Sequence, residues 1–358
     1  MDRETLKRYI QQIKPLNQAA MDQMEHYLDG LTKPVGALGK LEALLIQLAG
    51  ASGSLTIKTS PKVTVIMCSD NGVCDAGVSS CPQEVTATVT SNFTKGITAM
   101  NKLSEFAKAD IHVVDIGVKA DFQHPAIHNR KVCYGTKDMT QQPAMTEQEA
   151  LEAIAIGIEE TESLIQKGYE VFGTGEMGIG NTTTSAAITA VVLGEKVSQV
   201  TGKGSGALDE VYANKLQAIT KAIALHQPNP NDPIDVLAKV GGLDIAGLVG
   251  VYLAAAKHGK IVVIDGFISA AAALIAYQLA PLTKAYMVAS HLSKESGMAL
   301  ILQHMGLVPH LNLEMRLGEG SGCPILFNLL EMAHYTLLGM GTFEDAGVDK
   351  SHYMHIWK

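Results

Sequence analysis

Short apolar runs alternate with longer amphipathic segments through the middle of the chain. Five such apolar runs cover 62–70, 110–118, 170–178, 260–267 and 285–290. Each run ends at a Gly, an Asp or a Ser, or at the residue next to one of these. Segments with apolar residues at helical spacing lie at 147–167, 182–194, 209–226, 243–258 and 268–279. Apolar strands that alternate with helices are typical of a parallel sheet covered on both faces. The pattern predicts an α/β fold with a doubly wound, mostly parallel, Rossmann-like sheet.

The two ends of the chain have a purely helical pattern. Residues 3–13 and 17–29 show helical spacing, and a third amphipathic helix is expected from about Leu38. A polar linker ends at Pro61, and the sequence returns to helix from Pro324 before a polar tail. We therefore expect a small helical domain from residues 1–60 with part of 330–358, and a large α/β domain at 61–330.

Composition and charge narrow the class of protein. Apolar residues make up 47% of the 358 residues and charged residues 18%, which favours a packed globular core. The net charge of -8, without a Lys/Arg cluster, argues against a nucleic-acid partner. No apolar run suits a signal peptide or a bilayer span, and the five cysteines form no CxxC pair. We expect a cytoplasmic protein with reduced thiols and no membrane partner.

The Gly-rich segment 173–187, GTGEMGIGNTTTSAA, is the strongest candidate for chemistry. Gly178 and Gly180 precede Asn181 and Thr182, which open a helix of small residues, and such a turn can bind a phosphate through its N–H groups. The alternative is a tight strand–helix turn without a ligand. No Lys precedes the threonines, so the segment is not a Walker loop. Glu176 lies in the same turn. It could bind a ribose hydroxyl or accept a proton, and the alternative is a solvated turn residue.

A second carboxylate lies between two glycines near the C-terminal helix. Glu319, flanked by Gly318 and Gly320, can serve as a general base, although a loop salt bridge to Arg316 is the more common arrangement for such a residue. Lys215 could reach a phosphate, but a solvated helix lysine is more usual. No HExxH motif occurs, and the pair His352 and His355 lies in the polar tail, so the spacing indicates no metal site.

Taken together, these segments resemble the nicotinate-nucleotide–dimethylbenzimidazole phosphoribosyltransferases of cobalamin lower-ligand assembly. The motifs that carry the resemblance follow the family's order and span nearly the whole chain: KPVGALGKLE, GVSSCPQEVT, VVDIGV, GTGEMGIGNTTTSAA, VGGLDIAGLVG, IDGFISAAAAL, HLSKESG and RLGEGSG. The resemblance implies transfer of phosphoribose from nicotinate mononucleotide to 5,6-dimethylbenzimidazole or a related base. The products would be α-ribazole 5′-phosphate and nicotinate, and no cofactor or metal would be needed.

The resemblance also implies roles for individual residues. Glu319 would be the catalytic base, and Glu176 a second base or a sugar-orienting group. The residues expected to hold the phosphate and nucleotide are Gly178, Gly180, Asn181, Thr182, Gly204, Ser205, Lys215 and Ser293. Those expected to line the pocket of the acceptor base are Ser80, Thr88, Met177 and Leu317. A homodimer is a further expectation.

Departures from the family pattern leave the acceptor base open. The family often has His where Asn71 stands, Gln where Thr88 stands and Arg where Leu292 stands. A non-catalytic sensor of the base or of α-ribazole is the alternative function, and the presence of both Glu176 and Glu319 argues against it. A nucleotide phosphotransferase would need a phosphate-loop Lys or a metal-binding carboxylate pair, and neither is placed for that role.

Overall fold

The computed structural model describes residues 1–202 and 208–349. Its centre is a sheet of six parallel strands in the order β3-β2-β1-β4-β5-β6. The strands are β1 (Lys62–Ser69), β2 (Asp110–Gly117), β3 (Ile127–Asn129), β4 (Val171–Met177), β5 (Ile261–Ile264) and β6 (Met287–Ala289). This order is the doubly wound one, so the predicted Rossmann-like α/β fold is confirmed. The strand β3 was not predicted, because three residues are too few to show a period.

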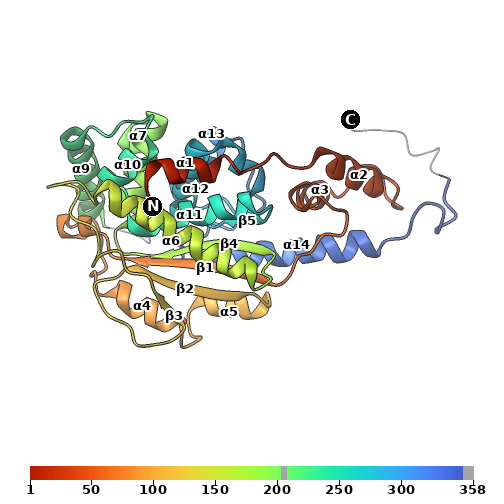
Figure 1. The fold of residues 1–358 in the computed structure, drawn as a ribbon, viewed down its shortest axis with the longest axis horizontal. Coiled ribbons are helices and arrows are strands. Elements are labelled where there is room, and N and C mark those ends of the chain that lie inside the picture. The colour runs from red at the N-terminus through yellow and green to blue at the C-terminus, as the bar shows by residue number, and fades with distance from the viewer. Residues whose placement is uncertain (203–207, 350–358) are drawn as a thin grey trace.

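Helices occupy the segments between and around the strands (Figure 1). They are α1 (Arg3–Ile10), α2 (Gln18–Asp29), α3 (Lys40–Ser52), α4 (Val85–Phe93), α5 (Ala99–Phe106), α6 (Glu147–Gln166), α7 (Asn181–Leu193), α8 (Val197–Val200), α9 (Asp209–His226), α10 (Pro233–Val240), α11 (Leu243–Lys257), α12 (Phe267–Leu279), α13 (Ser296–Met305) and α14 (Gly322–Gly339). Short 3₁₀ segments lie at Gly72–Ala76 and Pro281–Tyr286. The predicted helices at 147–167, 182–194, 209–226, 243–258 and 268–279 agree with these bounds to within a residue.

Side chains of each strand alternate between two apolar layers. Val65 and Met67 of β1 belong to the core formed with α6, α11 and α12, whereas Ile66 and Cys68 pack with α4 and α5. Val263 of β5 belongs to a third cluster, with α3 and α14. Helices therefore cover both faces of the sheet, as the continuously apolar strands require.

The helices at the two ends of the chain pack in two places. Met24 and Leu45, from α2 and α3, share an apolar cluster with Phe327 of α14. Figure 1 shows α2 and α3 at one end of the molecule, and α14 runs from the sheet toward that end. The helix α1 lies elsewhere, because Leu6 packs in the main core and Arg3 pairs with Glu147 at the start of α6. The division of the chain near residues 60 and 330 stays a prediction.

The strand order creates a crevice at the carboxyl ends of the strands. The chain runs outward from β1 through β2 to β3, and then returns to the other side of β1 to add β4, β5 and β6. Helices that follow β1 and β4 therefore leave toward opposite sides, which opens a gap at the carboxyl ends of these two strands. Ligands of such sheets bind in this gap.

Two further expectations concern cysteines and membrane spans. All five cysteines lie within the described residues, and each is a free thiol. Among the helices of residues 1–202 and 208–349, none has both the length and the apolar character that crossing a membrane requires.

Facing glycines allow α6 and α11 to approach closely. A Cβ on Gly157 of α6 would lie 1.9 Å from the carbonyl oxygen of Gly247 in α11. A Cβ on Gly250 would likewise lie 2.1 Å from the carbonyl oxygen of Ile154. These contacts involve backbone atoms, which cannot move aside as a flexible side chain can.

We expect Gly157→Ala to lower the free energy of unfolding by about 1–3 kcal/mol, because the added methyl must push the two helices apart. Gly339→Ala, in α14, is the control, since a Cβ there meets no atom within 4 Å. That change should leave stability the same or raise it by up to about 1 kcal/mol. Denaturant unfolding of both variants measures the difference, and equal stabilities would contradict the close approach.

Candidate active site

A cavity of about 250 Å³ opens at the carboxyl ends of the central strands. Its lining comes from the loops that follow β1, β4, β5 and β6, from α9, and from the segment that precedes α14. The lining includes most of the residues expected from the sequence: Ser80, Glu176, Met177, Gly178, Gly180, Asn181, Thr182, Lys215, Ser293, Leu317 and Glu319. Residues from six distant parts of the sequence thus meet in one cleft.

Among the expected residues that the structure describes, Thr88 is not in this lining. Thr88 is exposed on α4, and its hydroxyl donates a hydrogen bond of 3.2 Å to the carbonyl oxygen of Glu84. Val85 and Val89, one helical turn apart, line the cleft from α4. Gly204 and Ser205 lie outside the described residues, so their roles stay predictions, as does that of Thr88.

Glu319 lies in a left-handed turn of three consecutive residues. The φ angles are 79° at Gly318, 61° at Glu319 and 83° at Gly320. A positive φ is unusual for a residue with a side chain and costs of order 1–3 kcal/mol. The two glycines accept this conformation without cost, so the strain of the turn falls on Glu319 alone.

The buried carboxylate of Asp265, directly after β5, holds this turn. It accepts hydrogen bonds from the backbone N–H of Gly320, at 2.9 Å, and from that of Gly322, at 2.6 Å. Gly322 is the first residue of α14, so the carboxylate also lies at the positive end of a helix. Asp265 therefore positions the catalytic candidate Glu319 through the backbone.

The turn also lies directly on β4. A Cβ on Gly175 would be 2.9 Å from the carbonyl oxygen of Glu319, so only glycine leaves room there. The backbone N–H of Glu319 approaches Oε1 of Glu176 at 3.4 Å. Among the described residues, no ion pair joins Glu319 to Arg316, so the salt-bridged loop arrangement is not formed.

A cluster of buried carboxylates lies beneath the cleft. The amide of Asn181 donates to Oδ2 of Asp244 at 3.0 Å and also to the carboxylate of Glu176. Burial, strengthened by the charge of Asp244, raises the pKa of Glu176 to about 8. Burial raises the pKa of Asp265 to about 7 and that of Asp244 to about 6. Around neutral pH the cluster therefore keeps part of its protons.

Glu319 is more exposed than these carboxylates, although Glu176 also lines the cleft. Glu319 is half-buried and lines the cavity, and burial raises its pKa above the ordinary value for a glutamate. A carboxylate of raised pKa that is open to a ligand is suited to accept a proton. Glu176, of which only 6% is exposed, is better suited to hold a proton and donate a hydrogen bond.

One end of the cleft carries the features of an anion site. The helix α7 begins at Asn181, after Gly180 with a φ of 94°, and points its first turn into the cavity. The Nζ of Lys215, a buried residue of α9, donates to Oγ1 of Thr182 at 2.9 Å and to the carbonyl oxygen of Gly202 at 3.3 Å. A helix start combined with a buried lysine can bind a phosphate.

Asp244 and Asp265 were not predicted as site residues. Each is a lone carboxylate in an otherwise apolar stretch, in GGLDIAGLVG and in IVVIDGF. An isolated charge in a run that must be buried is a signal of a functional group, because burial of an unsatisfied charge is costly. That signal was present in the sequence.

Comparisons with known proteins identify the family of the chain. A family model described as "Phosphoribosyltransferase" matches residues 13–348. The nicotinate-nucleotide–dimethylbenzimidazole phosphoribosyltransferase of Clostridium tetani is 47% identical over 351 residues, which are 98% of this chain and 96% of that protein. The chain belongs to this phosphoribosyltransferase family. The same name is carried by a Ruminiclostridium cellulolyticum protein that is 48% identical over 346 residues, 97% of this chain and 98% of that protein.

A solved structure extends the agreement to the fold. The crystal structure of the Thermus thermophilus nicotinate-nucleotide–dimethylbenzimidazole phosphoribosyltransferase superimposes with a TM-score of 0.88 at 38% identity, over 93% of this chain and 99% of that one. The family resemblance drawn from the motifs is therefore confirmed. The chain is a phosphoribosyltransferase, a pentosyl-transferring enzyme, and not a non-catalytic sensor.

The buried carboxylates of this phosphoribosyltransferase predict a pH dependence of stability. Their folded pKa values lie above those of the unfolded chain, so the folded state binds more protons between the two values. The stabilisation is complete below the unfolded pKa values and is lost as the pH rises through about 7 to 8. Each proton contributes a slope of about 1.4 kcal/mol per pH unit.

We therefore expect the free energy of unfolding to fall from about pH 6.5 to about pH 8.5, and Glu176→Gln to make this fall smaller. Denaturant unfolding at several pH values measures the slope. Glu4→Gln, at an exposed position of α1, is the control and should leave the slope as in the parent protein. A slope that Glu176→Gln does not change would show that Glu176 keeps its charge in the folded state.

Proposed function

We propose that this enzyme transfers phosphoribose from nicotinate mononucleotide to 5,6-dimethylbenzimidazole or a related base, giving α-ribazole 5′-phosphate and nicotinate in the assembly of the cobalamin nucleotide loop. The observation that carries the proposal is that Glu319, a half-buried carboxylate, lines the same cavity as the start of α7, Lys215 and several apolar side chains. The relatives' names supply the two substrates.

The 5′-phosphate would bind where α7 begins. The N–H groups of its first turn and the ammonium of Lys215 offer positive charge, and Gly178 and Gly180 let a phosphate approach the backbone. Burial lowers the pKa of Lys215, and a dianionic phosphate beside it would favour its charged form. Ser293, on the loop after β6, faces the same cavity and would contact the nucleotide.

The acceptor base would lie against the apolar side of the cleft. Val85 and Val89 of α4 pack in one cluster with Met177, and Leu317 lies on the rim with 51% of its surface exposed. A flat aromatic base covers such side chains well, and it would hide the exposed part of Leu317 from water. Ser80 lines the same cavity and would contribute a polar contact.

The chemistry requires one proton acceptor. A nitrogen of the base attacks the anomeric carbon from the face opposite to nicotinate, and the bond from that carbon to the pyridine nitrogen breaks, so the configuration inverts from β to α. The bonding pair returns to the nicotinate nitrogen, which neutralises its positive charge. The base loses its remaining N–H proton to the carboxylate of Glu319. Alignment of two bound reactants supplies a further part of the acceleration.

Glu176 and Asp265 would support this step in different ways. A protonated Glu176 can donate a hydrogen bond to a ribose hydroxyl while leaving the charge of Glu319 undisturbed. Asp265 does not line the cavity, and it acts as a positioning residue because it holds the backbone on both sides of Ser321. Two carboxylates in different environments would thus perform different tasks.

The proposal includes a homodimer and a cytoplasmic location. Large apolar side chains are exposed on the neighbouring helices α5 and α14, with 79% of Phe106, 57% of Met332 and 86% of Tyr335 accessible. A second copy of the chain would cover this surface. Five free thiols fit a reducing compartment.

We expect the purified enzyme to release nicotinate from nicotinate mononucleotide only when a benzimidazole is present, because the nucleophile is the second substrate. Chromatography with mass detection of nicotinate and of the α-ribazole product measures the reaction. Adenine and a phenol, offered in competition, identify the preferred acceptor. Binding of the nucleotide without release in the presence of any acceptor would contradict the proposed reaction.

We expect Glu319→Gln to lower turnover at least about a hundredfold, because the proton acceptor is lost while the shape of the turn is kept. Nucleotide affinity should stay within about threefold of the parent value, since the phosphate site is separate. Glu314→Gln is a matched control, because Glu314 also has a positive φ of 54° in the same segment but is exposed and lies outside the cavity lining. Turnover of Glu319→Gln equal to that of this control would transfer the role to Glu176 or to water.

A further inference from the structure

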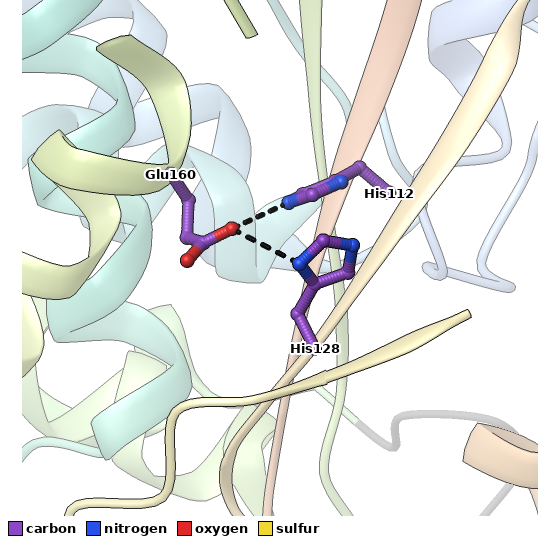
Figure 2. Close-up of side chains that lie close together, drawn as sticks. All are labelled: His112, His128 and Glu160. Atoms are coloured by element: carbon purple, nitrogen blue, oxygen red, sulfur yellow. Dashed lines mark hydrogen bonds and ion pairs between the residues drawn. The ribbon is translucent and has the colours of Figure 1, made fainter. Parts of the chain in front are cut away.

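Two histidines and a glutamate meet on the sheet away from the cleft. His112 lies on β2, His128 on the edge strand β3 and Glu160 on α6 (Figure 2). Nε2 of His112 is 2.8 Å from Oε2 of Glu160, and Nδ1 of His128 is 3.5 Å from the same oxygen. The three ligand-type atoms all lie within 4.8 Å of one another.

These separations suit a metal ion of the zinc type. Bonds of about 2.0–2.2 Å in a tetrahedral arrangement place neighbouring ligand atoms about 3.3 Å apart. The two distances from the histidine nitrogens to Oε2 of Glu160, 2.8 and 3.5 Å, lie on either side of that value, and all three ligand atoms lie within 4.8 Å of one another. Two imidazoles and one carboxylate favour Zn²⁺ or a similar transition metal over Ca²⁺ and Mg²⁺, which prefer oxygen ligands.

Neighbouring groups hold the ligands in place. Nη1 of Arg130 donates to Oε1 of Glu160 at 2.5 Å, which leaves Oε2 turned toward the two histidines. Arg130 also pairs with Glu159, so its charge is shared between two carboxylates. Such outer contacts fix the orientation of metal ligands.

We propose that His112, His128 and Glu160 form a binding site for Zn²⁺ in this enzyme. The ion would have these three protein ligands, and the fourth position would take a water molecule, because 38% of the His128 side chain is accessible to solvent. Sequence spacing did not indicate this site, since its ligands come from three separate elements. It is also distinct from the catalytic cleft.

The position of the site indicates a structural role. His112 is the third residue of β2, whereas the cavity lies at the carboxyl ends of the strands. The edge strand β3 has only three residues and pairs with β2 alone, so few backbone hydrogen bonds hold it. An ion bound by these ligands would join β3 both to its neighbour β2 and to α6, the helix that covers this face of the sheet.

The test is a Zn²⁺ titration of the full chain after treatment with a chelator, read through competition with a chromophoric zinc indicator. The tail sequence carries His352 and His355, so the titration is run on the parent chain and on a variant with both changed to Ala. That variant should still bind one equivalent of Zn²⁺. Adding His128→Ala to it should weaken binding at least about tenfold, the scale expected for loss of a metal-site group.

His258→Ala is the matched control. His258 pairs with Glu162 of the same helix α6 at 2.8 Å, but that pair is not part of a three-ligand cluster in the described residues. The control should keep the affinity of the parent. Because His112 is buried and its replacement can disturb folding, His112→Asn is compared by circular dichroism before its affinity is interpreted, and His128→Ala carries the test.

A second readout is the thermal stability of the same proteins. Zn²⁺ at about a hundredfold excess over its dissociation constant should raise the Tm of the parent by roughly 3–5 °C and that of His128→Ala by little. Turnover should be unaffected in both, so failure of this inference leaves the proposed reaction standing. Either of two results would overturn the proposed site. One is an unchanged Zn²⁺ affinity in His128→Ala, and the other is loss of all Zn²⁺ binding when only His352 and His355 are replaced. The three residues would then belong only to an ion-paired network of Glu160 and Arg130.

Discussion

The carboxylate of Asp265 holds the turn on which the active site depends. It accepts two backbone hydrogen bonds, from Gly320 and Gly322, at the point where the chain enters α14. A hydrogen bond contributes about 0.5–1.5 kcal/mol, and more when its acceptor is charged, whereas the left-handed conformation of Glu319 costs about 1–3 kcal/mol. The two bonds together therefore offset a strain of this size. Without them the turn would relax, and Glu319 would leave its place above β4.

The carboxylates near the cavity differ in burial, and this difference suits them to different roles. Glu176 and Asp244 share the amide of Asn181, and both are removed from water, so their charges disfavour one another. A proton on Glu176 relieves this repulsion at neutral pH. Glu319 also lines the cleft but is only half-buried, so in the proposed reaction it is the carboxylate that an incoming base would reach. The same low-polarity surroundings that raise these pKa values also strengthen each hydrogen bond in the site.

The cleft and the cluster of His112, His128 and Glu160 lie at different positions along the strands of the sheet. The cleft lies at the carboxyl ends, where loops of varied length can place residues without disturbing the core. The cluster of His112, His128 and Glu160 lies in the first half of β2 and on the short β3. An edge strand is the least supported part of a sheet, so an ion that joins it to α6 stabilises the place where the fold needs support.

The sequence by itself determined the alternation of strands and helices, the Gly-rich turn after β4 and the Gly-flanked Glu319. Each is a local pattern, because apolar period, cap residues and glycine flanks involve neighbours in the chain. The tertiary structure decided which residues far apart in the chain contact one another. Asp265 reaches Gly320 across 55 positions, and His112 reaches Glu160 across 48. Such contacts depend on how strands and helices pack in space, and no period along the chain records which distant side chains that packing brings together.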